Sequence, residues 1–158
     1  MQSSENTGQR RQYSLATLLP FLKVQGLDQN LAFEKRKVRE VLSIDDMHGA
    51  IDHGRGITML YNSRPIPVVD CRKESRRKGL LNATAIIAEV VTCNVAIIVD
   101  NVNGTVEIPL ATLSIDKWDD THNCGLSGVV FNELENLFLI DLDLMLGSAV
   151  KTFLLHHR

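Results

Sequence analysis

Two stretches of the chain hold side chains that can bind metal ions or transfer protons. The first contains Asp45, Asp46, His48, Asp52 and His53, interspersed with glycine. Imidazole and carboxylate groups are ligands of zinc and iron, but this spacing follows neither the His-Glu-x-x-His motif nor another closed ligand pattern. We therefore interpret the stretch as a solvated loop and expect no metal site in it.

The second stretch contains Asp119, Asp120, His122 and Cys124. A cysteine near a histidine is the pair that activates a thiolate nucleophile, but no segment of the chain supplies an oxyanion-hole motif. None of the three cysteines is spaced as in a zinc-binding CxxC motif. The sequence therefore predicts no catalytic residue, no metal and no cofactor, and we do not expect an enzyme.

Basic residues cluster at Lys35–Lys37, Arg72-Lys73 and Arg76–Lys78, where they could contact phosphate groups. Acidic residues such as Glu34 and Glu74 interrupt these clusters, and 17 basic against 19 acidic residues give a net charge of -2. Aromatic residues make up only 5% of the chain, which leaves few platforms for stacking bases. The balance argues against a nucleic-acid-binding protein.

The first twelve residues, 1–12, are polar and lack the apolar stretch of a signal peptide, so we expect a disordered arm there. The most apolar stretch, Leu137–Leu155, contains Asp141, Asp143 and Lys151, which a lipid-spanning helix would not tolerate. An odd number of cysteines suits a reducing compartment. We expect a cytoplasmic protein without direct membrane insertion.

The elements of the first half are short and rich in β-formers. Ser14–Val24 reads either as a short helix broken at its proline or as a strand that leads into a turn. Leu31–Ile44 alternates imperfectly and fits an edge strand with a bend, or a helix; we favour the strand. Ile57–Tyr61 and Arg64–Asp70 are separated by two residues, which is a hairpin pattern.

The second half contains further short apolar runs, at Ala83–Val91, Val95–Val99 and Val102–Ile108. A hairpin at Leu126–Ile140 and a helix from Asp141 onward complete the chain. About nine short strands with frequent turns indicate an all-β barrel or sandwich. The charged linker after Asp70 would divide it into two lobes.

Three motifs follow one another at a characteristic spacing. The first is Val38–Leu42, the second is Arg64–Asp70, and the third is Ile97–Val102 with Leu126–Val130 and Leu137–Asp143. Together they resemble the CheW family of bacterial chemotaxis adaptors, over residues 14–146.

The resemblance implies an all-β fold with a C-terminal helix, in which two SH3-like five-stranded β-barrel lobes pack side by side. It places a single domain at 13–158, with the first lobe at about 25–75 and the second at about 82–140. Residues 13–24 and the helix 141–155 would pack on these lobes.

The family's function implies a non-catalytic adaptor that couples chemoreceptors to a CheA-type histidine kinase by binding both. Its partners would be the regulatory domain of the kinase, the cytoplasmic tip of a methyl-accepting chemoreceptor, and other CheW-like domains, in the cytoplasm at membrane-associated receptor arrays. By family position, the residues expected to bind the kinase are Val38, Arg39, Glu40, Val41 and Leu42.

The receptor would bind in a groove between the lobes, lined by Asn62, Ser63, Arg64, Val102 and Thr105. The sequence departs from the family here, because Asn62 stands where the family usually has an arginine and Thr105 aligns with a valine. These departures leave an alternative open: an array-positioning or accessory scaffold that binds the kinase or like domains but not receptors.

Overall fold

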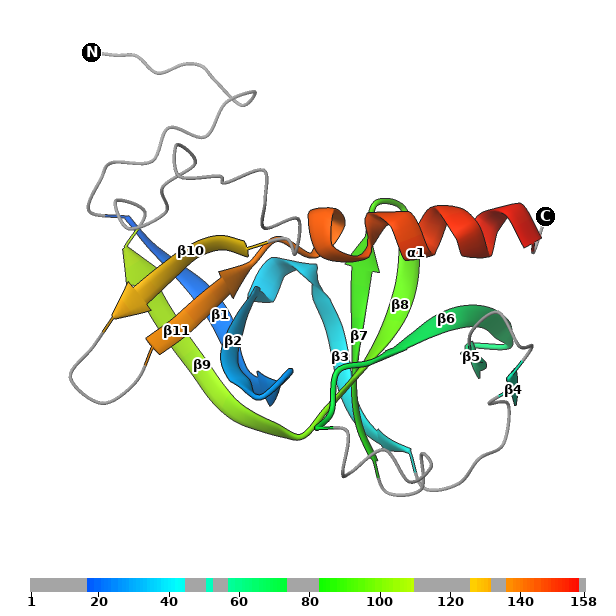
Figure 1. Ribbon diagram of the computed structural model, residues 1–158, viewed down its shortest axis with the longest axis horizontal. Helices are drawn as coiled ribbons and strands as arrows, with labels where there is room; N and C mark the ends of the chain where they lie inside the picture. Colours follow the sequence, from blue (N-terminus) through cyan, green and yellow to red (C-terminus); the bar gives the residue numbers. More distant parts are fainter. Residues whose placement is uncertain are drawn as a thin grey trace, which may run out of the picture.

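The computed structural model describes residues 17–44, 51–52, 57–73, 83–109, 126–131 and 136–156. Within these ranges the chain forms strands, one 3-10 turn at Lys35–Lys37 and one α-helix (Figure 1). The elements in chain order are β1 (Leu18–Gly26), β2 (Gln29–Glu34), β3 (Val38–Ile44), β4 (Ile51–Asp52), β5 (Ile57–Tyr61), β6 (Arg64–Asp70), β7 (Ala83–Val90), β8 (Cys93–Val99), β9 (Asn101–Pro109), β10 (Leu126–Phe131), β11 (Asn136–Ile140) and α1 (Leu142–His156).

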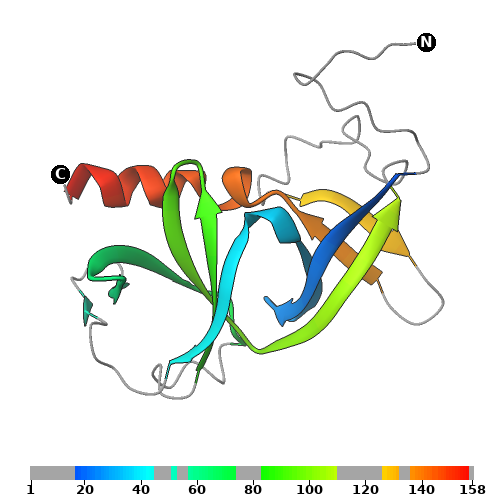
Figure 2. The ribbon, with the colours of Figure 1, turned by 180° about the vertical axis from the view of Figure 1, so that it is seen from behind.

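The strands form two sheets that lie side by side, as Figures 1 and 2 show from opposite sides. The first sheet has five strands in the order β10-β11-β2-β1-β9, and the second has six in the order β3-β7-β8-β6-β5-β4. Helix α1 runs along the six-stranded sheet and packs against β7 and β6. The predicted all-β fold of two barrel-like lobes with a C-terminal helix is confirmed, although one sheet has six strands rather than five.

The expected lobe ranges, about 25–75 and 82–140, do not correspond to the two sheets. β1 and β2 join β9, β10 and β11, whereas β7 and β8 join β3 to β6. The chain crosses between the sheets at Lys35–Lys37 and again at Asp100. The parallel pairings of β11 with β2 and of β6 with β8 connect segments far apart in the sequence, which local apolar patterns do not reveal.

The ambiguous segments of the first half are extended. The expected Ser14–Val24 segment contributes β1, a central strand of its sheet rather than an element packed outside a lobe. The Leu31–Ile44 segment contributes parts of β2 and β3, and the 3-10 turn is the bend between them. The expected arm, 1–12, lies outside the described residues.

The two-residue turns place residues other than glycine in the left-handed region of backbone space. Leu27 and Asp28 have φ of 53° and 62°, and Asn62 and Ser63 have φ of 51° and 64°. Positive φ at both central residues is typical of a type I′ turn, whose twist matches that of the flanking strands. The predicted β5–β6 hairpin is therefore confirmed, with its register fixed by the turn.

Helix α1 begins after Asp141, whose Oδ1 accepts a hydrogen bond from the Leu144 backbone N–H at 3.1 Å. This side chain satisfies one of the first N–H groups of the helix, as an N-cap does. The face of α1 that carries Leu142, Leu146 and Val150 is buried against the sheets. The predicted C-terminal helix is confirmed, and Asp141 caps it.

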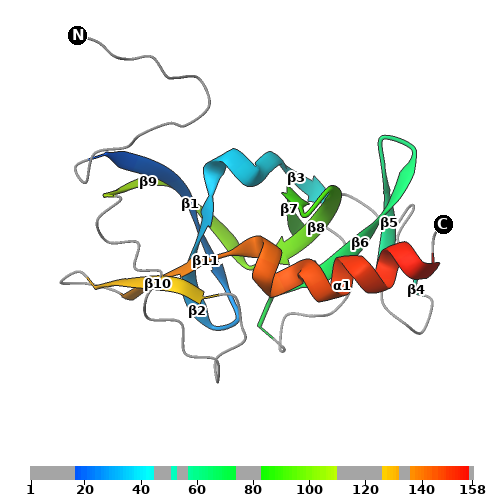
Figure 3. The same cartoon turned by 90° about the horizontal axis from the view of Figure 1, so that it is seen from above.

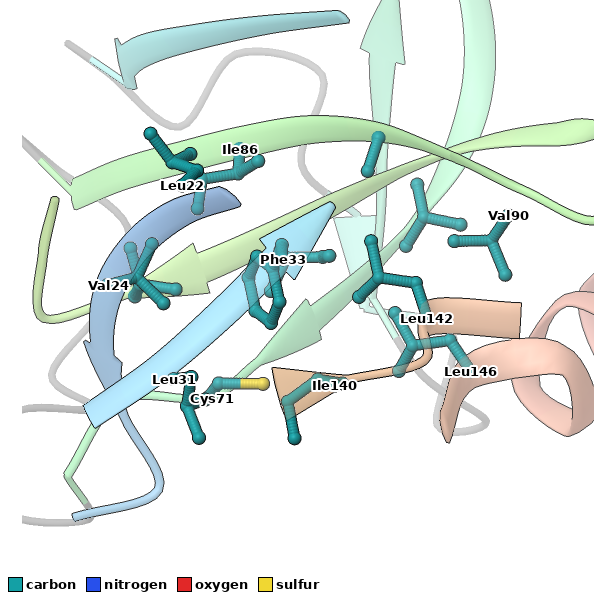
Figure 4. Packing of buried hydrophobic residues seen from close by; sticks show 14 of the residues in the cluster. Leu22, Val24, Leu31, Phe33, Cys71, Ile86, Val90, Ile140, Leu142 and Leu146 are labelled. Carbon is teal, nitrogen blue, oxygen red and sulfur yellow. The ribbon is translucent and has the colours of Figure 1, made fainter. Parts of the chain in front are cut away.

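The central strands β7 and β8 are apolar on both faces because each face meets a separate core. Ile86 and Ile97 belong to the cluster that also contains Phe33 and the buried face of α1 (Figure 4). Ile87 and Ile98 face the other way, into a second cluster lined by β3, β5 and β6. Burying each such side chain contributes about 1.5–3 kcal/mol, so these strands anchor the elements around them.

The two sheets are joined by backbone hydrogen bonds near the β1–β2 turn. The Leu27 N–H donates to the Cys71 carbonyl oxygen at 2.7 Å, and the Asp100 N–H donates to the Gln25 carbonyl oxygen at 2.8 Å. Gly26 lies at this junction, and a Cβ there would be only 3.0 Å from the Cys71 carbonyl oxygen. The close approach of the two backbones explains the glycine.

Candidate protein-docking surface

Strand β3 carries all five residues that the family resemblance assigns to kinase binding. It lies at one end of its sheet, where the described strands give it a single pairing partner, β7. Arg39, Glu40 and Val41 are exposed, whereas Val38 and Leu42 are half-buried. A bulge between Val38 and Glu40 shifts the alternation, so that Val38 packs on one core cluster and Leu42 on the other.

Strand β3 exposes Val41, which has 44% of its surface accessible, next to charged residues of the same strand. Val41 pairs with Ile86 and Glu40 with Ile87, so the Val41 and Glu40 side chains lie on opposite faces of the sheet. The Arg39 guanidinium pairs with the Glu89 carboxylate of β7. The Tyr61 hydroxyl donates a hydrogen bond to Glu40 Oε2 at 2.5 Å. Exposed apolar and charged side chains on one edge strand are typical of a protein-binding surface.

Tyr61 connects β3 to the end of β5. Its hydrogen bond to Glu40 raises the pKa of the phenol above its ordinary value of 10.0, and burial adds to this effect. Because Tyr61 directly precedes the β5–β6 turn, the bond brings that turn to the side of β3. Local sequence signals did not reveal Tyr61, since its partner lies 21 residues away.

The residues predicted to line the receptor groove belong to two parts of the fold. Asn62, Ser63 and Arg64 are exposed at the β5–β6 turn, in the six-stranded sheet. Val102 and Thr105 lie on β9, in the five-stranded sheet, where they pair with Val24 and Leu22 of β1. Figures 1 and 3 place β5 and β9 at opposite ends of the molecule.

The chain crosses between the sheets at Asp100, so β8 and β9 belong to different sheets. The Tyr61–Glu40 hydrogen bond ties the residue before the β5–β6 turn to β3. We call the exposed residues Arg39, Glu40 and Val41, together with Tyr61 and the turn at 62–64, the β3–β5 surface.

Most residues of the two clusters of acidic and imidazole side chains lie outside the described ranges. Asp45, Asp46, His48 and His53 lie outside the described residues, as does the whole second cluster at 119–124. Among the residues that the structure does describe, no three His, Cys, Asp or Glu side chains gather closely enough to hold a metal ion. In the described ranges, no helix has the length and apolar character needed to cross a membrane.

No family model matches the sequence. No curated protein matches it either. Among solved structures, the fold is similar to the scaffolding protein TtCheW from Thermoanaerobacter tengcongensis. The TM-score is 0.58 at 15% sequence identity, and the match covers 82% of this chain and 92% of that chain. The chain therefore has a CheW-like fold.

Proposed function

We propose that this chain is a non-catalytic adaptor of the CheW type, which binds the regulatory domain of a CheA-type histidine kinase through the β3–β5 surface. The observation that carries the proposal is the edge strand β3, which exposes the apolar Val41 and the charged Arg39 and Glu40. The likeness to a scaffolding protein supports the same class of function. An adaptor needs no catalytic group, and it would act in the cytoplasm at receptor arrays.

The β3–β5 surface has the properties of a transient docking site. The exposed apolar area of Val41 would supply affinity, while Arg39, Glu40 and Arg64 would select the partner and speed association. The Tyr61–Glu40 hydrogen bond holds the strand and the turn together before binding, which lowers the entropic cost of association.

Titration of the purified chain with the kinase regulatory domain tests the proposal. We expect saturable binding with a dissociation constant below about 100 μM, which corresponds to about 5.5 kcal/mol. Val41→Asp should weaken binding about tenfold or more, because it places a charge at the centre of the contact. Val38 is unsuitable for this test, since it packs on the core.

Leu18→Asp is the matched control for the Val41 variant. Leu18 is also an exposed strand residue, with 53% of its surface accessible, but it lies on β1 in the other sheet. This variant should bind the kinase domain as the wild type does. Equal weakening by the two variants, or no binding by the wild type, would refute the proposal.

A second candidate is an accessory scaffold that binds the kinase or other CheW-like domains but no receptor. The separation of Val102 and Thr105 from the β5–β6 turn favours it, because β9 and β5 lie at opposite ends of the molecule. Binding of the kinase domain without binding of a chemoreceptor cytoplasmic fragment would support this candidate. Binding of both would support the coupling adaptor.

A further inference from the structure

A cavity of about 320 Å³ opens where the two sheets meet, beside the β1–β2 turn. Its walls come from the β1–β2 hairpin, from Lys73 and from Asp100, which lies between β8 and β9. The polar side chains that line it are three carboxamides, two carboxylates and one ammonium: Gln25, Gln29, Asn30, Asp28, Asp100 and Lys73.

The walls of the cavity are held in place by the backbone. Hydrogen bonds from the Leu27 N–H to Cys71 and from the Asp100 N–H to Gln25 fix the turn against the other sheet. The Leu27-Asp28 turn has positive φ at both residues, so the position of Asp28 is set by a tight turn rather than by a mobile loop. A ligand would therefore meet side chains whose backbone is already ordered.

The ammonium group of Lys73 already lies among the carboxylates that line the cavity. Its backbone N–H donates to both carboxylate oxygens of Asp100, at 3.1 and 3.3 Å, and its ammonium lies 3.1 Å from Asp28 Oδ1. The Lys73 and Asp28 side chains are 51% and 66% exposed, and ion pairs so exposed are weak. The ammonium can be displaced, and two carboxylates then face one cavity.

Two of the carboxamides add hydrogen-bond acceptors to this charge. Gln25 is not one of them, because its Oε1 already accepts a hydrogen bond from Asn101 Nδ2 at 2.9 Å. The side chains of Gln29 and Asn30 have no hydrogen bond to other residues in the described part of the chain. Their oxygens can accept from a ligand that carries several N–H groups.

A guanidinium group fits this set of partners better than a simple ammonium. It carries five N–H donors in a rigid plane, forms paired hydrogen bonds with carboxylates, and is more weakly hydrated than an ammonium. We infer that the cavity binds a guanidinium group, which displaces the Lys73 ammonium from Asp28 and donates to Asp28, Asp100 and the carboxamide oxygens of Gln29 and Asn30. This site shares no residue with the β3–β5 surface, and it does not depend on the proposed adaptor function.

The test is an NMR titration of the full isotope-labelled chain with N-acetyl-arginine amide. N-acetyl-citrulline amide is the matched probe, because it has nearly the same shape but no charge. The arginine probe should shift the backbone amide signals of Asp28, Lys73 and Asp100 to saturation. The citrulline probe should bind about tenfold more weakly or not at all, because its hydrogen bonds to the carboxylates lack charge assistance.

Variants identify the groups responsible. Asp28→Asn and Asp100→Asn should each weaken the arginine probe about tenfold, because each removes a charge-assisted pair but retains an acceptor oxygen. Asn also tolerates the positive φ at position 28. Glu107→Gln, an exposed acid on β9, should leave binding unchanged. Lys73→Met should tighten binding several-fold, because it removes the competing ammonium.

The Lys73→Met variant distinguishes a site for a guanidinium group from a site for an anion. A site for an anion would lose affinity with Lys73→Met, and that result would overturn the inference. Equal shifts with the arginine and citrulline probes, or equal weakening by Glu107→Gln and Asp28→Asn, would overturn it too. Free arginine, tested beside the blocked amide, distinguishes a small-molecule ligand from the arginine side chain of a partner protein.

Discussion

Replacement of Asp143 by alanine should destabilise the fold by about 2 kcal/mol, because its carboxylate joins three elements. Asp143 Oδ1 accepts the Val91 backbone N–H at 2.7 Å, in the turn between β7 and β8. Asp143 Oδ2 accepts from the Lys37 ammonium at 2.9 Å, at the crossing between the sheets. Val91 has a φ of 60°, which is strained for a β-branched residue, so the turn depends on contacts of this kind.

The expected loss of stability follows from how exposed the Asp143 and Lys37 side chains are. A hydrogen bond to a charged group contributes about 1.5–3 kcal/mol, and the lower end applies because 41% of the Asp143 side chain is accessible to water. The ion pair with Lys37 adds at most about 0.5 kcal/mol, because both side chains are partly solvated. Asp143→Asn keeps an acceptor for Val91 but loses the charge, so it should cost about 1 kcal/mol.

The pH dependence has a defined sign. Burial opposes ionisation of Asp143, but the hydrogen bond from Val91 and the charge of Lys37 outweigh it, so that the pKa lies below its ordinary value of 3.8. A carboxyl whose pKa is lower in the folded state stabilises the fold above its unfolded-state pKa and loses that contribution as the pH falls through the folded-state value. The difference between wild type and Asp143→Asn should therefore be full at pH 7 and shrink only in acid.

Urea denaturation at pH 7, repeated at several acidic pH values, measures these differences. For a chain of this size, 2 kcal/mol corresponds to a fall in Tm of about 4–8 °C. Asp28→Asn is the matched control, because Asp28 pairs with Lys73 but accepts no described backbone hydrogen bond. It should change stability by less than about 0.5 kcal/mol. If Asp143→Ala costs no more than this control, the role given to the Val91 hydrogen bond is wrong.

Three further variants test other parts of the structure. Gly26→Ala should cost about 1–3 kcal/mol in urea denaturation, because its Cβ would be 3.0 Å from the Cys71 carbonyl oxygen; a cost below about 0.5 kcal/mol would contradict that close approach. Ser63→Gly should raise stability by about 0.5–1 kcal/mol, because glycine adopts a φ of 64° without strain, and an unchanged Tm would contradict the turn geometry. Glu40→Gln should lower the pKa of Tyr61 toward 10.0, because the negative charge that disfavours the phenolate is removed. A spectrophotometric titration measures this pKa, and a titration curve like that of the wild type would argue against the hydrogen bond.

The class of fold and most of its elements follow from local patterns in the sequence. The β5–β6 hairpin was predictable because its turn has the length and residue types that a type I′ connection accepts. Helix α1 was predictable because an aspartate cap precedes a run of good helix formers. The motif at Val38–Leu42 predicted a strand, and this strand, β3, lies at the edge of the six-stranded sheet.

The arrangement of the strands was not predictable in the same way. Nothing near Asp100 indicates that β9 leaves the sheet of β8, because the two strands follow one another with a single residue between them. The sequence therefore could not show that Val102 and Thr105 lie on a strand at the opposite end of the molecule from β5. The Tyr61–Glu40 and Asp143–Val91 hydrogen bonds join residues 21 and 52 positions apart, and a linear pattern carries no information about such distances.

The interleaving of the sheets also affects how the chain reaches its native state. Each sheet needs strands from before and after the linker at 74–82, so neither can be completed from one half of the chain alone. Pairing of such distant segments requires long loops to close before the contacts form, and this entropic cost slows folding. During synthesis, β1 to β6 would leave the ribosome with unpaired edges, and a fragment that ends at the linker would be a poor independent protein and prone to aggregate.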